Sequence, residues 1–258
     1  MMILRLAGVL VGIDNQYDFS DRVRLWLADG APDFTVRVAP EELEREDEGR
    51  GLPREYLEFV CAYRHIAERM PDYDAFVFHG AAVVVDDLAY LITAPSGTGK
   101  TTQTRFWRYG LDCGAWVLNG DKPILRRDPG GFTVCGTPWR GKEGHGINAE
   151  RPIQGLCLLQ RGEEIRIAPA RPEEMIRFLI RQIYMPRDPA RADKLLSLLD
   201  ECCRTVPIWS LQSNLNIRAA RVSYEMMLRK GSTVMAWPCS SGCDSFCTSS
   251  GHSSRQRS

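Results

Sequence analysis

The sequence has no excess of charge of either sign. Its 258 residues contain 33 lysines and arginines and 33 aspartates and glutamates, so the formal net charge is zero. Proteins that bind nucleic acids by neutralising phosphates carry clustered positive charge. This balance therefore argues against a nucleic-acid partner, and any affinity for anions must come from a local site.

Long apolar runs are also missing. The longest one near the start, Leu6–Ile13, is far shorter than the roughly 20 residues that a membrane span needs. No small-residue cleavage site follows it, which argues against a signal peptide. We therefore expect a cytoplasmic protein with no membrane partner. Internal repeats, a Ser-His-Asp arrangement and a His-Glu-x-x-His motif are not recognisable either.

The nine cysteines are an odd number and do not suggest a disulfide framework. Six lie in apolar or helical contexts, where thiols behave as small buried hydrophobes: Cys61, Cys113, Cys135, Cys157, Cys202 and Cys203. The other three, Cys239, Cys243 and Cys247, lie in residues 231–258, a serine-rich segment without apolar periodicity. That composition predicts a disordered tail, and the cysteine spacing matches no two-by-two zinc pattern.

Turn residues and periodicity predict a small β-rich region and a helix over residues 1–72. Apolar runs in this region predict strands: Ile3–Ile13, Val23–Leu27 and Phe34–Val38. Six acids in Glu41–Glu48 indicate a solvated helix or loop, and Pro53 is expected to open a helix that ends before Pro71.

Residues 73–230 are predicted to form a second domain in which strands and helices alternate. The expected strands are Phe76–Val85, Ala89–Thr93, Ala115–Leu118, Phe132–Cys135, Ile153–Leu159, Glu164–Ile167 and Ile208–Leu211. The expected helices are Thr101–Tyr109, Pro172–Met185, Ala190–Cys203 and Ile217–Leu228.

The most informative stretch runs from Ala94 to Thr101, Ala-Pro-Ser-Gly-Thr-Gly-Lys-Thr, between a predicted strand and a predicted helix. This is the context of a phosphate-binding loop, in which glycines let successive amides converge on an anion at a helix N-terminus. The strict pattern has glycine where this chain has Ala94. We predict that the loop contacts ATP phosphates through Ser96, Gly97, Thr98, Gly99, Lys100, Thr101 and Thr102.

Two further residues complete the predicted site. Asp121 ends a predicted strand about 20 residues after the loop, where such nucleotide-binding proteins place an acid that helps to hold Mg²⁺. Thr101 can offer its hydroxyl to the same ion. His79 lies at the end of the strand Phe76–Phe78 and is followed by Gly80.

Four ordered motifs resemble the catalytic domain of the HPr kinase/phosphorylase family, whose fold is shared with ATP-using phosphoenolpyruvate carboxykinase. The motifs are Phe78-His-Gly80, Thr93–Thr101, Asn119-x-Asp-Lys-Pro123 and Gly136-Thr-Pro-Trp139. They look most like a branch of short proteins that accompany peptide-modification systems. The resemblance covers roughly residues 75–230. It implies an α/β fold with a mixed sheet around the phosphate loop, and relatives that assemble into rings, so a homo-oligomer is possible.

The resemblance also implies roles. Lys100 and the loop amides would hold ATP, and Thr101 and Asp121 the magnesium ion. The family commonly has two consecutive acids, the first a base toward the acceptor hydroxyl and the second a partner of the histidine that matches His79. Here Gly120 takes the first position and Asp121 the second. A missing base typically costs about 10²–10⁴ in rate. The family's signature for the reverse phosphorolysis is not recognisable, so no phosphorylase activity is predicted.

We therefore predict an ATP- and Mg²⁺-dependent kinase that phosphorylates a serine hydroxyl of a peptide or protein, with Asp121, His79 and Lys100 as catalytic residues. Because of Gly120, a catalytically weak nucleotide-binding sensor or scaffold is the alternative, and a small-molecule kinase or carboxykinase-like enzyme is a third. Arg140 and Lys142 belong either to the phosphate or substrate site or to a solvated loop. His65 and His145 are expected to be structural or at the surface.

Overall fold

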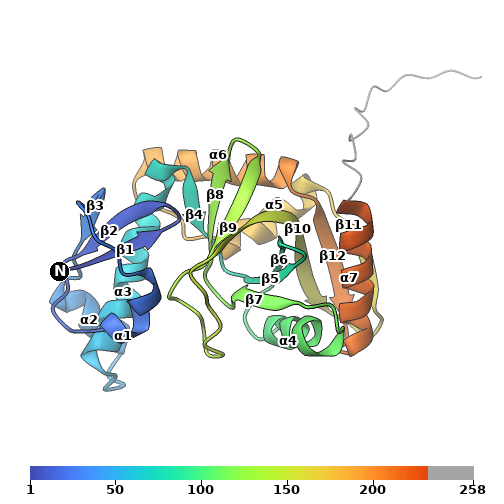
Figure 1. Cartoon of the computed structure of the whole chain (residues 1–258), viewed down its shortest axis with the longest axis horizontal. Helices are drawn as coiled ribbons and strands as arrows, with labels where there is room; N and C mark the ends of the chain where they lie inside the picture. Colours follow the sequence, from blue (N-terminus) through green and yellow to red (C-terminus); the bar gives the residue numbers. More distant parts are fainter. Residues whose placement is uncertain (232–258) are drawn as a thin grey trace, which may run out of the picture.

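The computed structural model describes residues 1–231, and within them a small sheet precedes a large one (Figure 1). The small sheet contains β1 (Met2–Leu6), β2 (Val9–Ile13) and β3 (Phe34–Val36). The helical elements of this region are α1 (Ser20–Val23), the 3-10 turn η1 (Arg24–Trp26), α2 (Pro40–Asp47), α3 (Arg54–Arg69) and the 3-10 turn η2 (Met70–Tyr73). Apart from Gly231, which ends the last helix, the predicted tail with Cys239, Cys243 and Cys247 lies outside the described residues.

The apolar run Ile3–Ile13 forms a hairpin rather than one strand. Ala7 and Gly8 have φ angles of 51° and 84°, and Leu6 pairs with Val9 across them. Positive φ at both central residues is the mark of a type I′ turn, whose twist matches that of the two strands. β3 then pairs with β2 in parallel.

The predicted strand Val23–Leu27 is wrong, because this segment is helical. Val23 and Trp26 are both buried, whereas Arg24 and Leu25 between them are exposed. A spacing of three residues places two side chains on one side of a helical turn, while a strand would alternate. The indole of Trp26 also donates a hydrogen bond to the carbonyl of Gly136, which fixes the turn against the large sheet.

The large sheet has nine strands and mixes parallel and antiparallel pairs. Its strands are β4 (Ala75–Val77), β5 (Ala81–Val85), β6 (Leu88–Thr93), β7 (Trp116–Asn119), β8 (Ile124–Asp128), β9 (Gly131–Cys135), β10 (Glu150–Arg161), β11 (Arg166–Pro169) and β12 (Ile208–Ser213). The order is β4-β8-β9-β10-β6-β5-β7, with β12 beside β10 and β11 beside β12. The long β10 pairs with β9 through its first residues and with β6 and β12 through its later ones.

Helices cover both faces of this sheet (Figure 1). They are α4 (Lys100–Gly110), α5 (Pro172–Leu179) with the turn η3 (Ile180–Gln182), α6 (Pro189–Thr205) and α7 (Ile217–Gly231). Leu91 and Leu158 pack in the cluster that contains α5 and α6, whereas Ile92 and Leu159 pack in the cluster that contains α4 and α7. This alternation with a period of two buries both faces. The predicted mixed α/β fold with a β-rich N-terminal region is confirmed.

Two strand predictions in this part need correction. Phe76–Val85 is not one strand, since β4 pairs with β8 while β5 pairs with β6 and β7, and Phe78, His79 and Gly80 join them. β8 has no counterpart among the predicted strands because only its first two residues are apolar. Its charged residues are paired instead: Arg126 with Asp128 and Glu150, and Arg127 with Asp74 and Glu201.

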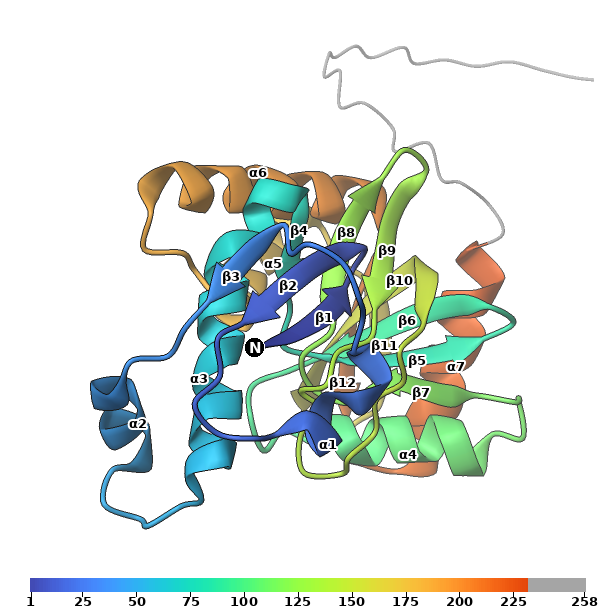
Figure 2. The same cartoon turned by 60° about the vertical axis from the view of Figure 1, so that its left-hand side comes forward.

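The N-terminal elements gather at the end of the large sheet where β4 and β8 lie (Figure 2). One apolar cluster contains residues of β1–β3 and α3 together with Ala75, Val77, Ile124, Cys135 and Trp139. The indole of Trp139 stacks on Phe59 with ring centroids 5.5 Å apart and donates a hydrogen bond to the Phe59 carbonyl. The two regions therefore share buried side chains, and the division at residues 72 and 73 stays a prediction. None of the helices in the described part of the chain has the length and apolar sequence of a membrane span.

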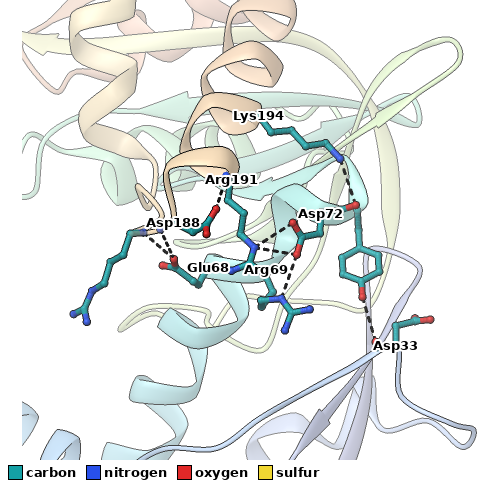
Figure 3. A network of polar contacts seen from close by, with 9 residues as sticks. Asp33, Glu68, Arg69, Asp72, Asp188, Arg191 and Lys194 are labelled. Atoms are coloured by element: carbon teal, nitrogen blue, oxygen red, sulfur yellow. Dashed lines mark hydrogen bonds and ion pairs between the residues drawn. The ribbon is translucent and has the colours of Figure 1, made fainter.

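A polar network ties the end of α3 to the start of α6 (Figure 3). The carboxylate of Asp72 accepts hydrogen bonds from the guanidinium groups of Arg69 and Arg191. Glu68 accepts from the backbone amides of Arg187 and Asp188. Each of these half-exposed contacts contributes little alone, but together they join the N-terminal region to a helix that is more than a hundred residues away in sequence.

Glu58 is an unusual feature of α3, because its side chain is fully buried. Its two carboxylate oxygens accept hydrogen bonds from the backbone amides of Gln16 and Tyr17, at 2.8 and 2.7 Å. A buried carboxylate is tolerated only when its oxygens are paired in this way. Glu58 thus fixes the segment between β2 and α1 against α3.

We predict that Glu58→Gln lowers the free energy of unfolding by about 1–3 kcal/mol, because an amide NH₂ would face one of the two backbone donors. Glu55→Gln, on the same helix, is the matched control, since no hydrogen bond or ion pair of its side chain exists among the described residues. Urea denaturation of both variants measures the difference. Equal stabilities would contradict the role of Glu58.

Candidate functional site

Four strand ends and one strand start meet at the same edge of the large sheet. β6, β10 and β12 are parallel, so their carboxyl ends lie together. β5 runs antiparallel to both β6 and β7, so the start of β5 and the end of β7 lie at that edge too. The predicted loop, His79 and Asp121 follow or precede these ends. The topology therefore brings together residues that are far apart in the sequence.

The loop Ala94–Gly99 connects β6 directly to α4. Gly97 and Gly99 have φ angles of 78° and 118°, which other residues rarely adopt. A Cβ atom at Gly99 would also overlap the side chain of Leu215, which follows β12. Among the described residues, the backbone amides of Gly97, Gly99 and Lys100 donate to no protein acceptor. The predicted strand–loop–helix context is confirmed, and glycine is required where the chain passes Leu215.

Lys100 lies at the first position of α4 and is half-buried. Its ammonium group donates a 2.9 Å hydrogen bond to the carbonyl of Ala94, so the side chain folds back across the loop. Burial lowers the pKa of Lys100 from its ordinary value, and the negative charge of Asp121 opposes this shift.

Arg161 is a residue that the sequence reading misses. At the end of β10, its guanidinium donates to the carbonyls of Thr98 and Gly97, at 3.1 and 3.2 Å. Two loop carbonyls are thereby held by one cation, which restricts the conformation of the loop. No local pattern announces this role, since Arg161 is about 60 residues from the loop and meets it only because β10 is parallel to β6.

Asp121 and His79 lie together, as predicted. Nε2 of His79 is 3.3 Å from one carboxylate oxygen of Asp121, and the ammonium of Lys122 is 3.5 Å from the other. The backbone joins them as well, since the amide of Gly80 donates to the carbonyl of Asp121. Burial disfavours the carboxylate, but the hydrogen bond to His79 and the charge of Lys122 prevail and lower the pKa of Asp121.

The buried side chain of Asn119 positions this group. Its carbonyl oxygen accepts hydrogen bonds from the amides of Asp121 and Lys122, both at 2.9 Å. Its NH₂ group donates to the backbone carbonyl and the hydroxyl of Thr137, at 3.0 and 3.1 Å. Asn119 therefore joins the turn that carries Asp121 to the segment after β9. The motif contains this residue, but its role becomes visible only with Thr137 beside it.

Gly120, the position at which the resemblance implies an acid, packs against the segment that contains residues 138–146. Its amide donates to the carbonyl of His145 at 2.9 Å. A Cβ atom at Gly120 would lie 3.1 Å from the carbonyl oxygen of Arg140. That is closer than most Cβ contacts, so any side chain at position 120 requires a small shift of this segment.

A cavity of about 620 Å³ opens beside Asp121. One wall comes from the N-terminal region, with Arg22 of α1 and several residues of α3, and the other from residues 138–144. Arg140 and Lys142, for which the sequence left two readings open, line this cavity. His145 contacts Arg108, and His65 contacts Glu42, in agreement with a structural or surface role for both histidines.

The sequence matches no protein-family model, and no curated protein matches it. Among solved structures, the chain is similar to the Hpr(Ser) kinase/phosphatase from Coxiella burnetii. The match covers 60% of this chain and 94% of that chain, with a TM-score of 0.30 and 13% sequence identity. A likeness this low transfers no residue role or activity to the chain. The resemblance carried by the four motifs therefore stays a prediction.

We predict that Asn119→Ala lowers the free energy of unfolding by about 1–3 kcal/mol for each buried partner left unsatisfied. Asn148→Ala is the control, because that exposed amide donates a single hydrogen bond, to the Leu25 carbonyl. Asn148→Ala should lower the free energy of unfolding by less than about 1 kcal/mol. Denaturant titration checks both values, and a comparable loss in the two variants would argue against Asn119 as the organiser of the turn.

Proposed function

We propose that the protein is an ATP- and Mg²⁺-dependent kinase that transfers the γ-phosphoryl group to a serine hydroxyl of a peptide or protein. The observation that carries the proposal is Lys100, whose ammonium group folds across a glycine-containing loop at a helix start and donates to the Ala94 carbonyl. The serine acceptor is proposed from the four ordered motifs alone.

A nucleotide triphosphate fits the residues of the loop. The free amides of Gly97, Gly99 and Lys100 are donors without protein acceptors among the described residues, and the start of α4 adds the positive end of its helix dipole. The Lys100 ammonium can exchange the Ala94 carbonyl for a phosphate oxygen. Such an exchange replaces a neutral acceptor with a charged one and strengthens the hydrogen bond.

Magnesium fits the site as an ion held largely by the nucleotide. In the described part of the chain, no cluster of three or more histidine, cysteine, aspartate or glutamate residues is able to hold a metal. Mg²⁺ commonly binds through one or two protein groups plus phosphates and water. Thr101, exposed in the first turn of α4, and the ionised Asp121 would supply those groups. The ion would neutralise charge on the phosphates during transfer.

Proton removal from the acceptor is the weakest part of this site. Gly120 has no side chain, and the lowered pKa of Asp121 makes its carboxylate a weak base. Both oxygens of Asp121 also face cationic or hydrogen-bonding partners. Phosphoryl transfer tolerates this because its loose transition state depends mainly on positioning and electrostatics. We therefore expect a slow kinase. A nucleotide-binding sensor or scaffold without transfer activity is the second proposal, and Gly120 is the observation that favours it.

For Lys100→Ala we predict that the dissociation constant for ATP rises by about tenfold or more, since a charged hydrogen bond contributes about 1.5–3 kcal/mol. Arg105→Ala is the matched control, because this exposed cation lies on the same helix, a turn beyond the loop. Isothermal titration calorimetry measures the dissociation constant for ATP of both variants. An unchanged affinity in Lys100→Ala would refute the assignment of the loop.

For Gly120→Asp we predict that the rate of phosphoryl transfer rises by about 10²-fold, the lower range of what a general base contributes. Gly120→Asn controls for the close approach to the Arg140 carbonyl, because it adds nearly the same volume without a base. Transfer from labelled ATP to candidate peptides gives the rates. If neither variant transfers phosphate, the sensor proposal gains support, whereas equal measurable rates in the two variants favour Asp121 as the base.

A further inference from the structure

The cavity beside Asp121 is built by two parts of the chain that the sequence separates. α1 and α3 form one wall, and residues 138–144 form the other. Its volume of about 620 Å³ lies within the roughly 300–1,000 Å³ of sites that enclose small ligands. It is therefore large enough for a few side chains of a peptide. It adjoins the residues of the nucleotide site through Asp121 and Lys122.

Aromatic rings run along this cavity from Asp121 toward Arg22. Tyr63 lies close enough to Asp121 for the carboxylate charge, together with burial, to raise the pKa of its phenol. The ring centroids of Tyr63 and Trp139 are 5.6 Å apart, and the Trp139 ring stacks on that of Phe59. The guanidinium of Arg22 then lies 5.8 Å from the centre of the Phe59 ring. Phe59 and Trp139 are themselves buried, so the ring surface open to the cavity comes from Tyr56, which is 37% exposed, and from the partly buried Tyr63.

Positive charge dominates the lining. The cations are Arg22, Arg64, Lys122, Arg140 and Lys142, and Asp121 is the one acid among the lining residues. Arg64 is already paired with Glu46, and Lys122 with Asp121. In the described part of the chain, Arg22, Arg140 and Lys142 have no ion pair. Three cations without an ion pair line this cavity and favour negative charge, although the chain as a whole is neutral and Arg22 also borders a second cavity that Asp18, Asp21 and Glu55 line.

From this charge and shape, and resting on the proposed kinase function, we infer that the cavity binds an acidic peptide segment that carries the acceptor serine. Acidic side chains of the peptide pair with Arg22, Arg140 and Lys142, and an apolar side chain packs on the rings of Tyr56 and Tyr63. The serine hydroxyl then lies at the Asp121 end, next to the nucleotide loop. Complementary charge of this kind selects partners and speeds their association.

The test is fluorescence anisotropy with a labelled peptide that contains one serine, one leucine and several glutamates, measured without nucleotide. The same peptide with glutamines is the comparison. We expect the glutamine peptide to bind about tenfold more weakly, and the acidic peptide to lose affinity as salt rises. Arg22→Gln and Lys142→Gln should each weaken acidic-peptide binding by about threefold or more, with an unchanged dissociation constant for ATP.

Arg24→Gln is the matched control, since Arg24 is an exposed cation two residues from Arg22 and does not line the cavity. Its affinity for the acidic peptide should stay that of the unmodified protein. Equal binding of the two peptides, or equal effects of the Arg22 and Arg24 changes, overturns the inference while ATP binding and transfer to other peptides keep the kinase proposal intact. Charge-dependent peptide binding without any transfer from ATP overturns the kinase proposal and leaves the cavity as an acidic-peptide site.

Discussion

The candidate site depends on one buried carboxamide. Asn119 has no exposed surface and makes four hydrogen bonds, two with the turn that contains Asp121 and two with Thr137. Because its carbonyl oxygen and its NH₂ group both make hydrogen bonds, this one side chain holds the end of β7 against the segment after β9. Thr137 extends the connection by donating to the Lys122 carbonyl. The distance between Asp121 and the cavity wall is therefore set by the sheet and not by a freely moving loop.

The sheet supplies the rest of the arrangement. Parallel pairing of β6, β10 and β12 brings Arg161 and Leu215 to the loop. Arg161 donates hydrogen bonds to two loop carbonyls, and the side chain of Leu215 packs against Gly99. Leu215 itself adopts a φ angle of 61°, which is uncommon for a residue with a branched side chain. Backbone strain of this kind persists where the surrounding contacts require it. The loop conformation is thus imposed from two neighbouring strands in addition to its own glycines.

What the sequence could and could not predict follows from this division. The strand–loop–helix context was predictable from a short segment with a recognisable pattern, and the resemblance implied the pairing of His79 with Asp121. The helical turn Arg24–Trp26 was not, since the apolar run Val23–Leu27 favours a strand until the contact between Trp26 and Gly136 decides otherwise. Arg161 and Arg22 were missed for a related reason. Both contact residues that are distant in the sequence, and a lone arginine at a strand end or in a short helix carries no signal of its own.

Gly120 gains a structural meaning from the cavity. The resemblance makes it look like a lost base, but the missing side chain also lets the Arg140 carbonyl approach the end of β7 more closely than most Cβ atoms would permit. That approach places Arg140 and Lys142 beside Asp121, where they line the cavity. An acid at position 120 would press against this segment and add a negative charge next to the cations. The close approach of Arg140 to the end of β7 thus depends in part on Gly120, and in a kinase of the proposed kind accurate positioning of the acceptor matters more than fast proton removal.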